Sequence, residues 1–200
     1  MPIIKPLQLE PTSDIEDFAA TVFQPNTLSI IYGPERVGKT ALLYKLLLHR
    51  FRTEENMKGI FLGLDKYDSY QYHQKRLAEV MAVSSIREKF TSMDLYKFTD
   101  PNTFFGFISV LPHITLDIES QFIFVDGLNI LPDGTFQNKV IIELKFLANC
   151  GIPVLASTIT KPNLCNLIDY PSVKNQTFQL ERPEFLGDDI LEFGDTRLLF

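Results

Sequence analysis

One stretch of the sequence combines residue types and a spacing that are suited to holding phosphate. It has the pattern G-x-x-x-x-G-K-T and, with the residue after it, consists of Gly33, Pro34, Glu35, Arg36, Val37, Gly38, Lys39, Thr40 and Ala41. The backbone N–H groups of such a loop, and the positive end of the helix that follows it, point at an anion. The ammonium of Lys39 would reach the terminal phosphates, and the hydroxyl of Thr40 would bind Mg²⁺. The stretch therefore predicts a binding site for a nucleoside triphosphate and its metal ion.

Asp126 is the second residue with a predicted chemical role. It directly follows the apolar run 122–125, which has the character of a buried strand. An acid held at a strand end after a phosphate-binding loop is typical of a Walker B residue, which binds the Mg²⁺ that neutralises the phosphate oxygens. The alternative is an ordinary aspartate in a strand-terminal turn. We expect Asp126 to bind the metal together with Thr40.

Asp65 is the candidate for the carboxylate that orients the attacking water. It ends the apolar run 60–64, the first predicted strand after the phosphate-binding loop. The alternative is a solvated turn residue within 65–68, and the sequence leaves both open.

Apolar strands alternate with helical segments along the whole chain. We expect strands at 28–32, 58–64, 95–98, 121–127, 152–159 and 177–180, and helices at 15–22, 41–48, 68–81, 102–111 and 138–149. Such alternation predicts an α/β fold with a mostly parallel central sheet and helices on both faces. Ligands of such sheets bind at the carboxyl ends of the strands, where we expect Thr40, Asp65, Asp126 and Thr158.

Composition limits the classes of function. The 200 residues suit one domain spanning 1–200, with an N-terminal extension over 1–22 and a short C-terminal tail over 187–200. The net charge of −6 excludes a generally basic nucleic-acid binder, so contact with DNA needs a local patch. No apolar run has the length of a membrane span and the first residues lack a signal-peptide pattern, so we expect a cytoplasmic protein without a membrane partner. We expect the two cysteines, Cys150 and Cys165, to be buried thiols.

Several segments of the chain resemble the RecA-like ATPases, and most closely the ATPase domain of bacterial DnaB-type replicative helicases. The resemblance extends over 20–186 and is carried by the segments 23–28, 33–40, 60–65, 122–131, 143–156 and 181–185. It implies a RecA-like P-loop NTPase fold in which the 152–159 strand lies between the strand before the loop and the strand before Asp126. It also implies ATP and Mg²⁺ as ligands, and action on single-stranded DNA in replication or recombination. The implied partners are further copies in a ring or a RecA-like partner subunit.

The chain departs from that family at positions that affect hydrolysis. Asp65 stands where the family has a catalytic glutamate, and Thr158 with Ile159 stands where it has a glutamine. Beyond residue 185 the strand that carries the arginine finger of the family is not recognisable, and Arg197 is the only arginine there. The leading hypothesis is an ATPase with helicase-like relatives. The alternatives are a catalytically weak or inactive nucleotide-binding subunit of a RecA-like complex and, third, a small-molecule kinase.

Overall fold

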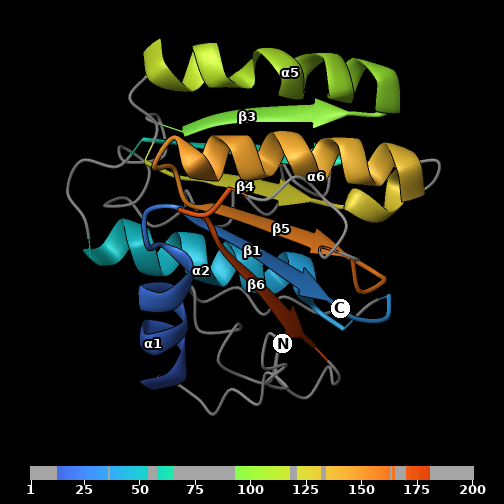
Figure 1. Ribbon diagram of the computed structural model, residues 1–200. Helices are drawn as coiled ribbons and strands as arrows, with labels where there is room; N and C mark the ends of the chain where they lie inside the picture. The colour runs from blue at the N-terminus through green and yellow to red at the C-terminus, as the bar shows by residue number, and fades with distance from the viewer. Residues whose placement is uncertain are drawn as a thin grey trace.

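The computed structural model describes residues 13–35, 37–53, 58–64, 93–117, 121–131, 134–162, 164 and 170–180. The elements in chain order are α1 (Ser13–Val22), β1 (Thr27–Tyr32), α2 (Lys39–Thr53), β2 (Gly59–Leu64), β3 (Met93–Phe98), α5 (Pro101–Asp117), β4 (Ile123–Asp126), the 3₁₀ helix η1 (Leu128–Ile130), α6 (Gly134–Asn149), β5 (Val154–Thr158) and β6 (Lys174–Gln179). Figure 1 shows them as a layered α/β structure. Among these residues, no helix has the length and apolar character that crossing a membrane requires.

The strands form one sheet in the order β3-β2-β4-β5-β1-β6, and every neighbouring pair is parallel. The parallel sheet predicted from the sequence is therefore confirmed. β5 lies between β1 and β4, which is the arrangement that the resemblance implies. Because all six described strands run in one direction, their carboxyl ends meet at one edge of the sheet (Figure 1).

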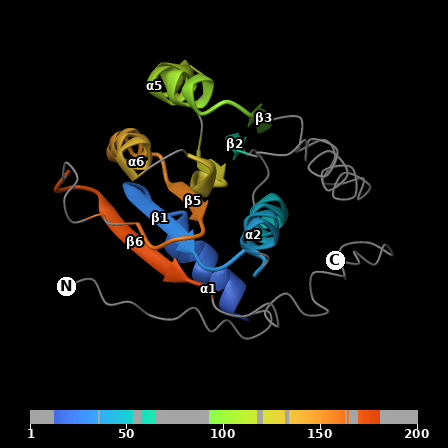
Figure 2. The same cartoon turned by 90° about the vertical axis from the view of Figure 1, so that its right-hand side faces the viewer.

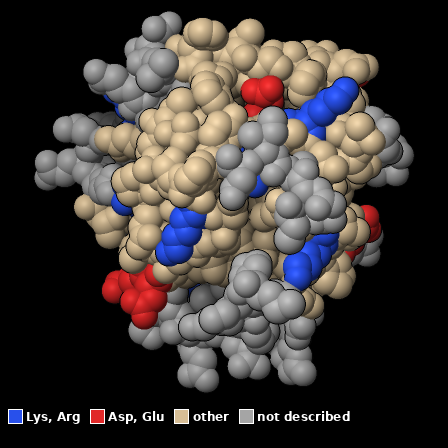
Figure 3. Space-filling view, in the orientation of Figure 1, with Lys and Arg blue, Asp and Glu red and all other residues tan. Residues whose placement is uncertain are grey.

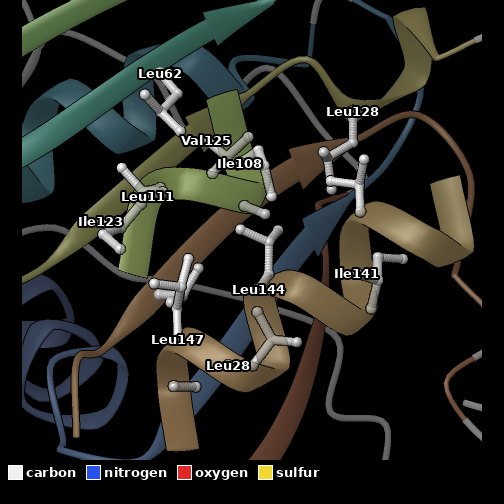
Figure 4. Packing of buried hydrophobic residues seen from close by; sticks show 14 of the residues in the cluster. Leu28, Leu62, Ile108, Leu111, Ile123, Val125, Leu128, Ile141, Leu144 and Leu147 are labelled. Carbon is white, nitrogen blue, oxygen red and sulfur yellow. The ribbon is translucent and has the colours of Figure 1, made fainter. Parts of the chain in front are cut away.

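Helices cover both faces of the sheet, as expected. Alternate residues of each strand point to opposite faces, so neighbouring residues of one strand join different cores. On one face, Phe61 and Phe124 pack with the buried residues of α1 and α2. On the other face, Leu62 and Val125 pack with those of α5 and α6. Figure 2 shows the two pairs of helices on either side of the sheet, and Figure 4 shows the second core at close range.

Several elements begin or end away from the predicted positions, among them α5, β6 and α6. The predicted helix over 102–111 stops just before Pro112, a residue that lacks the N–H that a helix interior needs. It continues instead to Asp117, and Leu111 and Ile114 on either side of the proline pack in the same core. β6 begins at Lys174 rather than at 177, because Lys174 donates its N–H to the carbonyl of Asn26 and so joins the ladder early.

The third difference bears on the candidate site. α6 begins at Gly134, one turn before the predicted start at 138. Tertiary contacts stabilise this turn, since the ring of Phe136 packs against Phe105 with a centroid distance of 5.4 Å. Gln137 consequently lies in a helix rather than in a loop.

Of the remaining predictions, two elements are confirmed, several segments lie outside the described residues, and one prediction is wrong. The strand expected at 95–98 and the helix expected at 15–22 are present as β3 and α1. The expected helix over 68–81 lies outside the described residues, as do the segments 1–12 and 187–200. The prediction of a buried thiol is wrong for Cys150, which follows the last turn of α6 and is exposed. Cys165 lies outside the described residues.

Candidate phosphate and metal site

The candidate site begins where β1 leaves the sheet and the G-x-x-x-x-G-K-T loop starts. The N–H of Leu180, just after β6, donates to the carbonyl of Tyr32 at 2.8 Å and extends the sheet to the edge of the loop. This brings the chain so close that a Cβ on Gly33 would lie 2.2 Å from the carbonyl oxygen of Leu180. Only glycine fits there, so the first glycine of the motif fixes the exit of the loop from the sheet.

Lys39 opens α2 and folds back over the loop. Its ammonium donates hydrogen bonds to the carbonyl oxygens of Gly33 at 2.9 Å and Pro34 at 2.6 Å. The side chain is buried, and this burial lowers the pKa of Lys39, while the carboxylates of Asp126 and Glu35 act in the opposite direction. The structure thus holds a buried cation at the start of a helix, where the helix dipole also favours an anion.

Thr40 and Asp126 meet at the carboxyl edge of the sheet. The Thr40 hydroxyl donates to Oδ2 of Asp126 at 2.7 Å, although 86 positions separate the two residues in the sequence. Thr40 lies in the first turn of α2 and Asp126 is the last residue of β4. The sequence-based expectation that these two side chains lie together is therefore consistent with the geometry.

Ser157 holds the other side of the Asp126 carboxylate. Its hydroxyl donates to Oδ1 of Asp126 and accepts the N–H of Gly127 at 3.0 Å. Ser157 is buried in β5, the strand next to β4. Ser157 is not among the site residues predicted from the sequence. A polar pair at the end of an apolar strand, Ser157 and Thr158, was the available signal, but the sequence does not give the register of this strand against the strand that ends in Asp126.

Thr158 and Gln137 form a second polar contact at the same edge. Thr158 ends β5, as expected, and pairs with Tyr32 in the β1–β5 register. The side-chain amide of Gln137 donates to the Thr158 hydroxyl at 3.1 Å. Gln137 is not among the site residues predicted from the sequence, because the predicted helix over 138–149 begins one residue after it.

The remaining predicted site residues divide into two groups. Within the loop, Pro34 and Glu35 are exposed, whereas Val37 is buried and Gly38 and Ala41 are partly buried. Arg36 and Asp65 lie outside the described residues. Asp65 directly follows Leu64, the last residue of β2, and β2 is the neighbour of β4 in the sheet.

The donor set at this edge fits Mg²⁺. That ion prefers oxygen ligands and is usually bound by one or two protein groups together with phosphate and water, rather than by a cage of side chains. The Thr40 hydroxyl and the Asp126 carboxylate are such groups. Over the described ranges there is no group of three or more His, Cys, Asp or Glu side chains that could hold a metal without those extra ligands.

Comparisons with known proteins give a distant similarity to solved structures and no match in sequence. No family profile matches the sequence, and no curated protein matches it. Among solved structures, the chain is similar to a KaiC-like protein from the hyperthermophilic archaeon Pyrococcus horikoshii, with 16% sequence identity and a TM-score of 0.49. The similarity covers 70% of this chain and 64% of that one, so the chain matches less than two thirds of its length. A similarity at this level assigns neither a family nor an activity.

Proposed function

We propose that this chain is a RecA-like P-loop ATPase that binds ATP with Mg²⁺. The observation that carries the proposal is the hydrogen bond between Thr40, at the start of the helix after the loop, and Asp126, at the end of β4. Hydroxyl and carboxylate from these two positions are what a nucleotide-bound Mg²⁺ requires. When bound, the ion supplies charge neutralisation at the phosphate oxygens.

Lys39 and the loop would bind the phosphates. In the structure, the Lys39 ammonium rests on two carbonyl oxygens of its own loop, those of Gly33 and Pro34. A phosphate oxygen is a stronger acceptor for a cation than a neutral carbonyl, because the hydrogen bond is charge-assisted at both ends. The lysine would therefore leave the loop carbonyls when the triphosphate enters. The loop N–H groups and the first turn of α2 would hold the remaining phosphate oxygens.

The order of the strands supports assignment to the RecA-like class. β5 lies between β1 and β4, so the strand before the loop and the strand before Asp126 are separated by one strand. The resemblance to DnaB-type helicases implies this order and also suggests a role in DNA replication or recombination. We propose that role on the resemblance alone, with single-stranded DNA as the nucleic acid and a ring of copies, or a RecA-like partner, as the assembly.

One face of the molecule shows no cluster of positive charge that would suit DNA. On this face, shown in Figure 3, the described Lys and Arg side chains lie apart from one another, and one of them lies beside an acidic side chain. Affinity for the nucleic-acid backbone comes from clustered positive charges. Nucleotide binding is therefore the part of the proposal with direct structural support, and action on DNA has to be tested separately.

The test is ATP binding measured by titration calorimetry in the presence of Mg²⁺. Lys39→Ala should lower the affinity by at least about tenfold, because a charge-assisted hydrogen bond to phosphate contributes roughly 1.5–3 kcal/mol. Lys174→Ala is the matched control, since Lys174 is exposed at the start of β6 and thus lies at the opposite edge of the sheet. The proposal fails if the wild-type chain binds no ATP, or if Lys39→Ala binds as tightly as Lys174→Ala.

A nucleotide-binding subunit without turnover is the second candidate function. It is favoured by Asp65, because the DnaB-type helicases that the chain resembles have a glutamate at this position. The aspartate side chain is one methylene shorter and would hold the attacking water less well. Turnover that is lost in both Asp65→Ala and Asp126→Ala would exclude this alternative. If the short acid limits hydrolysis, Asp65→Glu should raise kcat, measured with and without single-stranded DNA. The mass of the chain with ATP distinguishes a ring from a monomer.

A further inference from the structure

Ser157 forms one link of a directed hydrogen-bond chain that ends on the Asp126 carboxylate. The N–H of Gly127 donates to Ser157 Oγ at 3.0 Å, and the Ser157 hydroxyl donates to Asp126 Oδ1. A hydroxyl has one proton, and its direction follows from its partners. Because Ser157 accepts from a backbone N–H, which can only donate, its own proton is free to point at the carboxylate.

The two oxygens of Asp126 therefore have different partners. Oδ1 is bound to Ser157, inside the sheet, and Oδ2 is bound to Thr40, on the loop side. The terminal torsion of an aspartate is broad, so the carboxylate of an unsupported strand-end aspartate can rotate. A fixed donor on Oδ1 removes that freedom and keeps Oδ2 toward Thr40. The β4–β5 register, in which Val125 lies beside Ala156, brings the next residues on each strand, Asp126 and Ser157, together.

We propose that Ser157 is a positioning residue that aims Oδ2 of Asp126 at the divalent cation of the bound nucleotide. This inference rests on the proposed function and deepens it, because it adds a residue that supports the metal ligand without touching the metal. Groups that hydrogen-bond to a metal-binding side chain fix its orientation, and their loss typically lowers metal affinity by about 10–100-fold. Burial of Ser157 keeps water from replacing its hydroxyl.

The chain offers a matched control in Ser29. Ser29 lies in β1, the other neighbour of β5, and is buried as completely as Ser157. Its hydroxyl has no hydrogen-bond partner within the described part of the chain. Ser29→Ala therefore removes a buried hydroxyl from the same sheet without removing a contact to Asp126, and separates the loss of a hydroxyl from the loss of its hydrogen bond.

The experiment measures nucleotide affinity with and without metal in four proteins: wild type, Ser157→Ala, Ser157→Thr and Ser29→Ala. ATP is titrated with Mg²⁺ and then with EDTA, and Mn²⁺ bound to the ATP complex is followed by electron paramagnetic resonance. Ser157→Ala should weaken Mn²⁺ binding in the complex by about tenfold or more, while affinity for metal-free ATP stays as in wild type. Ser157→Thr retains the hydroxyl and should bind Mn²⁺ like wild type, as should Ser29→Ala.

Other results of this experiment would refute either the role of Ser157 or the proposed function. Ser157→Ala with wild-type Mn²⁺ affinity refutes the role of Ser157 while leaving nucleotide binding intact. Equal weakening with and without metal also refutes it, because a merely structural residue would affect both. If Ser157→Ala does not fold, Ser157→Cys replaces it, since a thiol has similar shape and is only a weak donor. A wild-type chain that binds no nucleotide refutes the proposed function, and the role of Ser157 with it.

Discussion

Gly127 provides a sharp test of the site geometry, because it lies directly after Asp126 and an added methyl group would meet main chain. Its backbone has φ of +92°, in the left-handed region. A Cβ at this position would lie 2.3 Å from the carbonyl oxygen of Leu64, at the end of β2. The oxygen is a main-chain atom of β2, which has a neighbouring strand on each side, so the contact cannot be relieved by rotating a side chain. Gly127→Ala should therefore destabilise the protein.

The expected loss has two contributions. A left-handed conformation costs an alanine about 1–2 kcal/mol relative to glycine. Relieving the contact with Leu64 needs a backbone shift at the end of β4 or β2, which for an overpacked interior costs about 1–3 kcal/mol. Together they lower the free energy of unfolding by about 2–5 kcal/mol, a large part of the ~5–15 kcal/mol of an ordinary domain. The shift would also displace Asp126, so Mg²⁺-dependent ATP binding should weaken.

Two other glycines separate these contributions. Gly151 has the same φ of +92°, but the nearest atom to its added Cβ is Oδ1 of Asn26 at 3.9 Å. Gly151→Ala should therefore show the conformational cost alone, about 1–2 kcal/mol. Gly106 lies in α5 and has no atom within 4 Å of an added Cβ. Gly106→Ala should stabilise the protein by about 0.5–1 kcal/mol, because alanine favours the helix.

The assay is urea unfolding of all four proteins, followed by far-UV circular dichroism, with m-values compared to confirm that the same transition is observed. The expected order of stability is Gly106→Ala, wild type, Gly151→Ala and then Gly127→Ala. Failure of Gly127→Ala to fold, while Gly151→Ala folds, is the extreme form of that order. The reasoning is refuted if Gly127→Ala is as stable as Gly151→Ala, because the contact with Leu64 would then have no cost.

Two further predictions concern titratable groups. Burial lowers the pKa of Lys39 in the folded chain. Between that lowered pKa and the ordinary lysine value, the unfolded chain binds a proton that the folded chain has released. The free energy of unfolding therefore rises with pH in this window. The affinity for ATP should fall as the pH rises through the lowered pKa of Lys39. In Lys39→Arg this pH dependence should be absent, because the guanidinium stays charged. Calorimetric titrations in which the two proteins show the same pH profile would contradict the prediction. At the start of α5, Asp100 accepts hydrogen bonds from the N–H and hydroxyl of Thr103 at 2.8 and 2.6 Å, and these bonds lower the pKa of Asp100. Asp100→Ala should lower the thermal midpoint of unfolding by about 2 °C at neutral pH, because it removes the side chain that caps α5. The difference between the two proteins should vanish as the pH falls through the lowered pKa of Asp100. A difference that stays constant with pH would show that the ionised carboxylate of Asp100 does not stabilise the helix.

The order of helices and strands could be predicted from the sequence because the signals are local. A run such as 122–125, with every residue apolar, indicates a strand buried on both faces wherever it lies in the sheet. The predictions were wrong mainly at element ends, where contacts from elsewhere in the chain outweigh local preference. α5 continues through Pro112 and α6 begins one turn early at Gly134, in each case with core side chains that pack across the added turn.

In the candidate site, too, some features follow from short segments of the sequence and others from the tertiary structure. The sequence by itself determined the candidate residues of the G-x-x-x-x-G-K-T loop, among them Lys39 and Thr40, and the candidate Asp126 at a strand end, because their spacing and flanking apolar runs are properties of short segments. Tertiary structure alone decided that Ser157 holds Asp126 and that Gln137 reaches Thr158. The physical reason is that such contacts depend on which strands are neighbours and on their register. Neighbours and register are set by the packing of both faces of the sheet, which no short segment of the sequence contains.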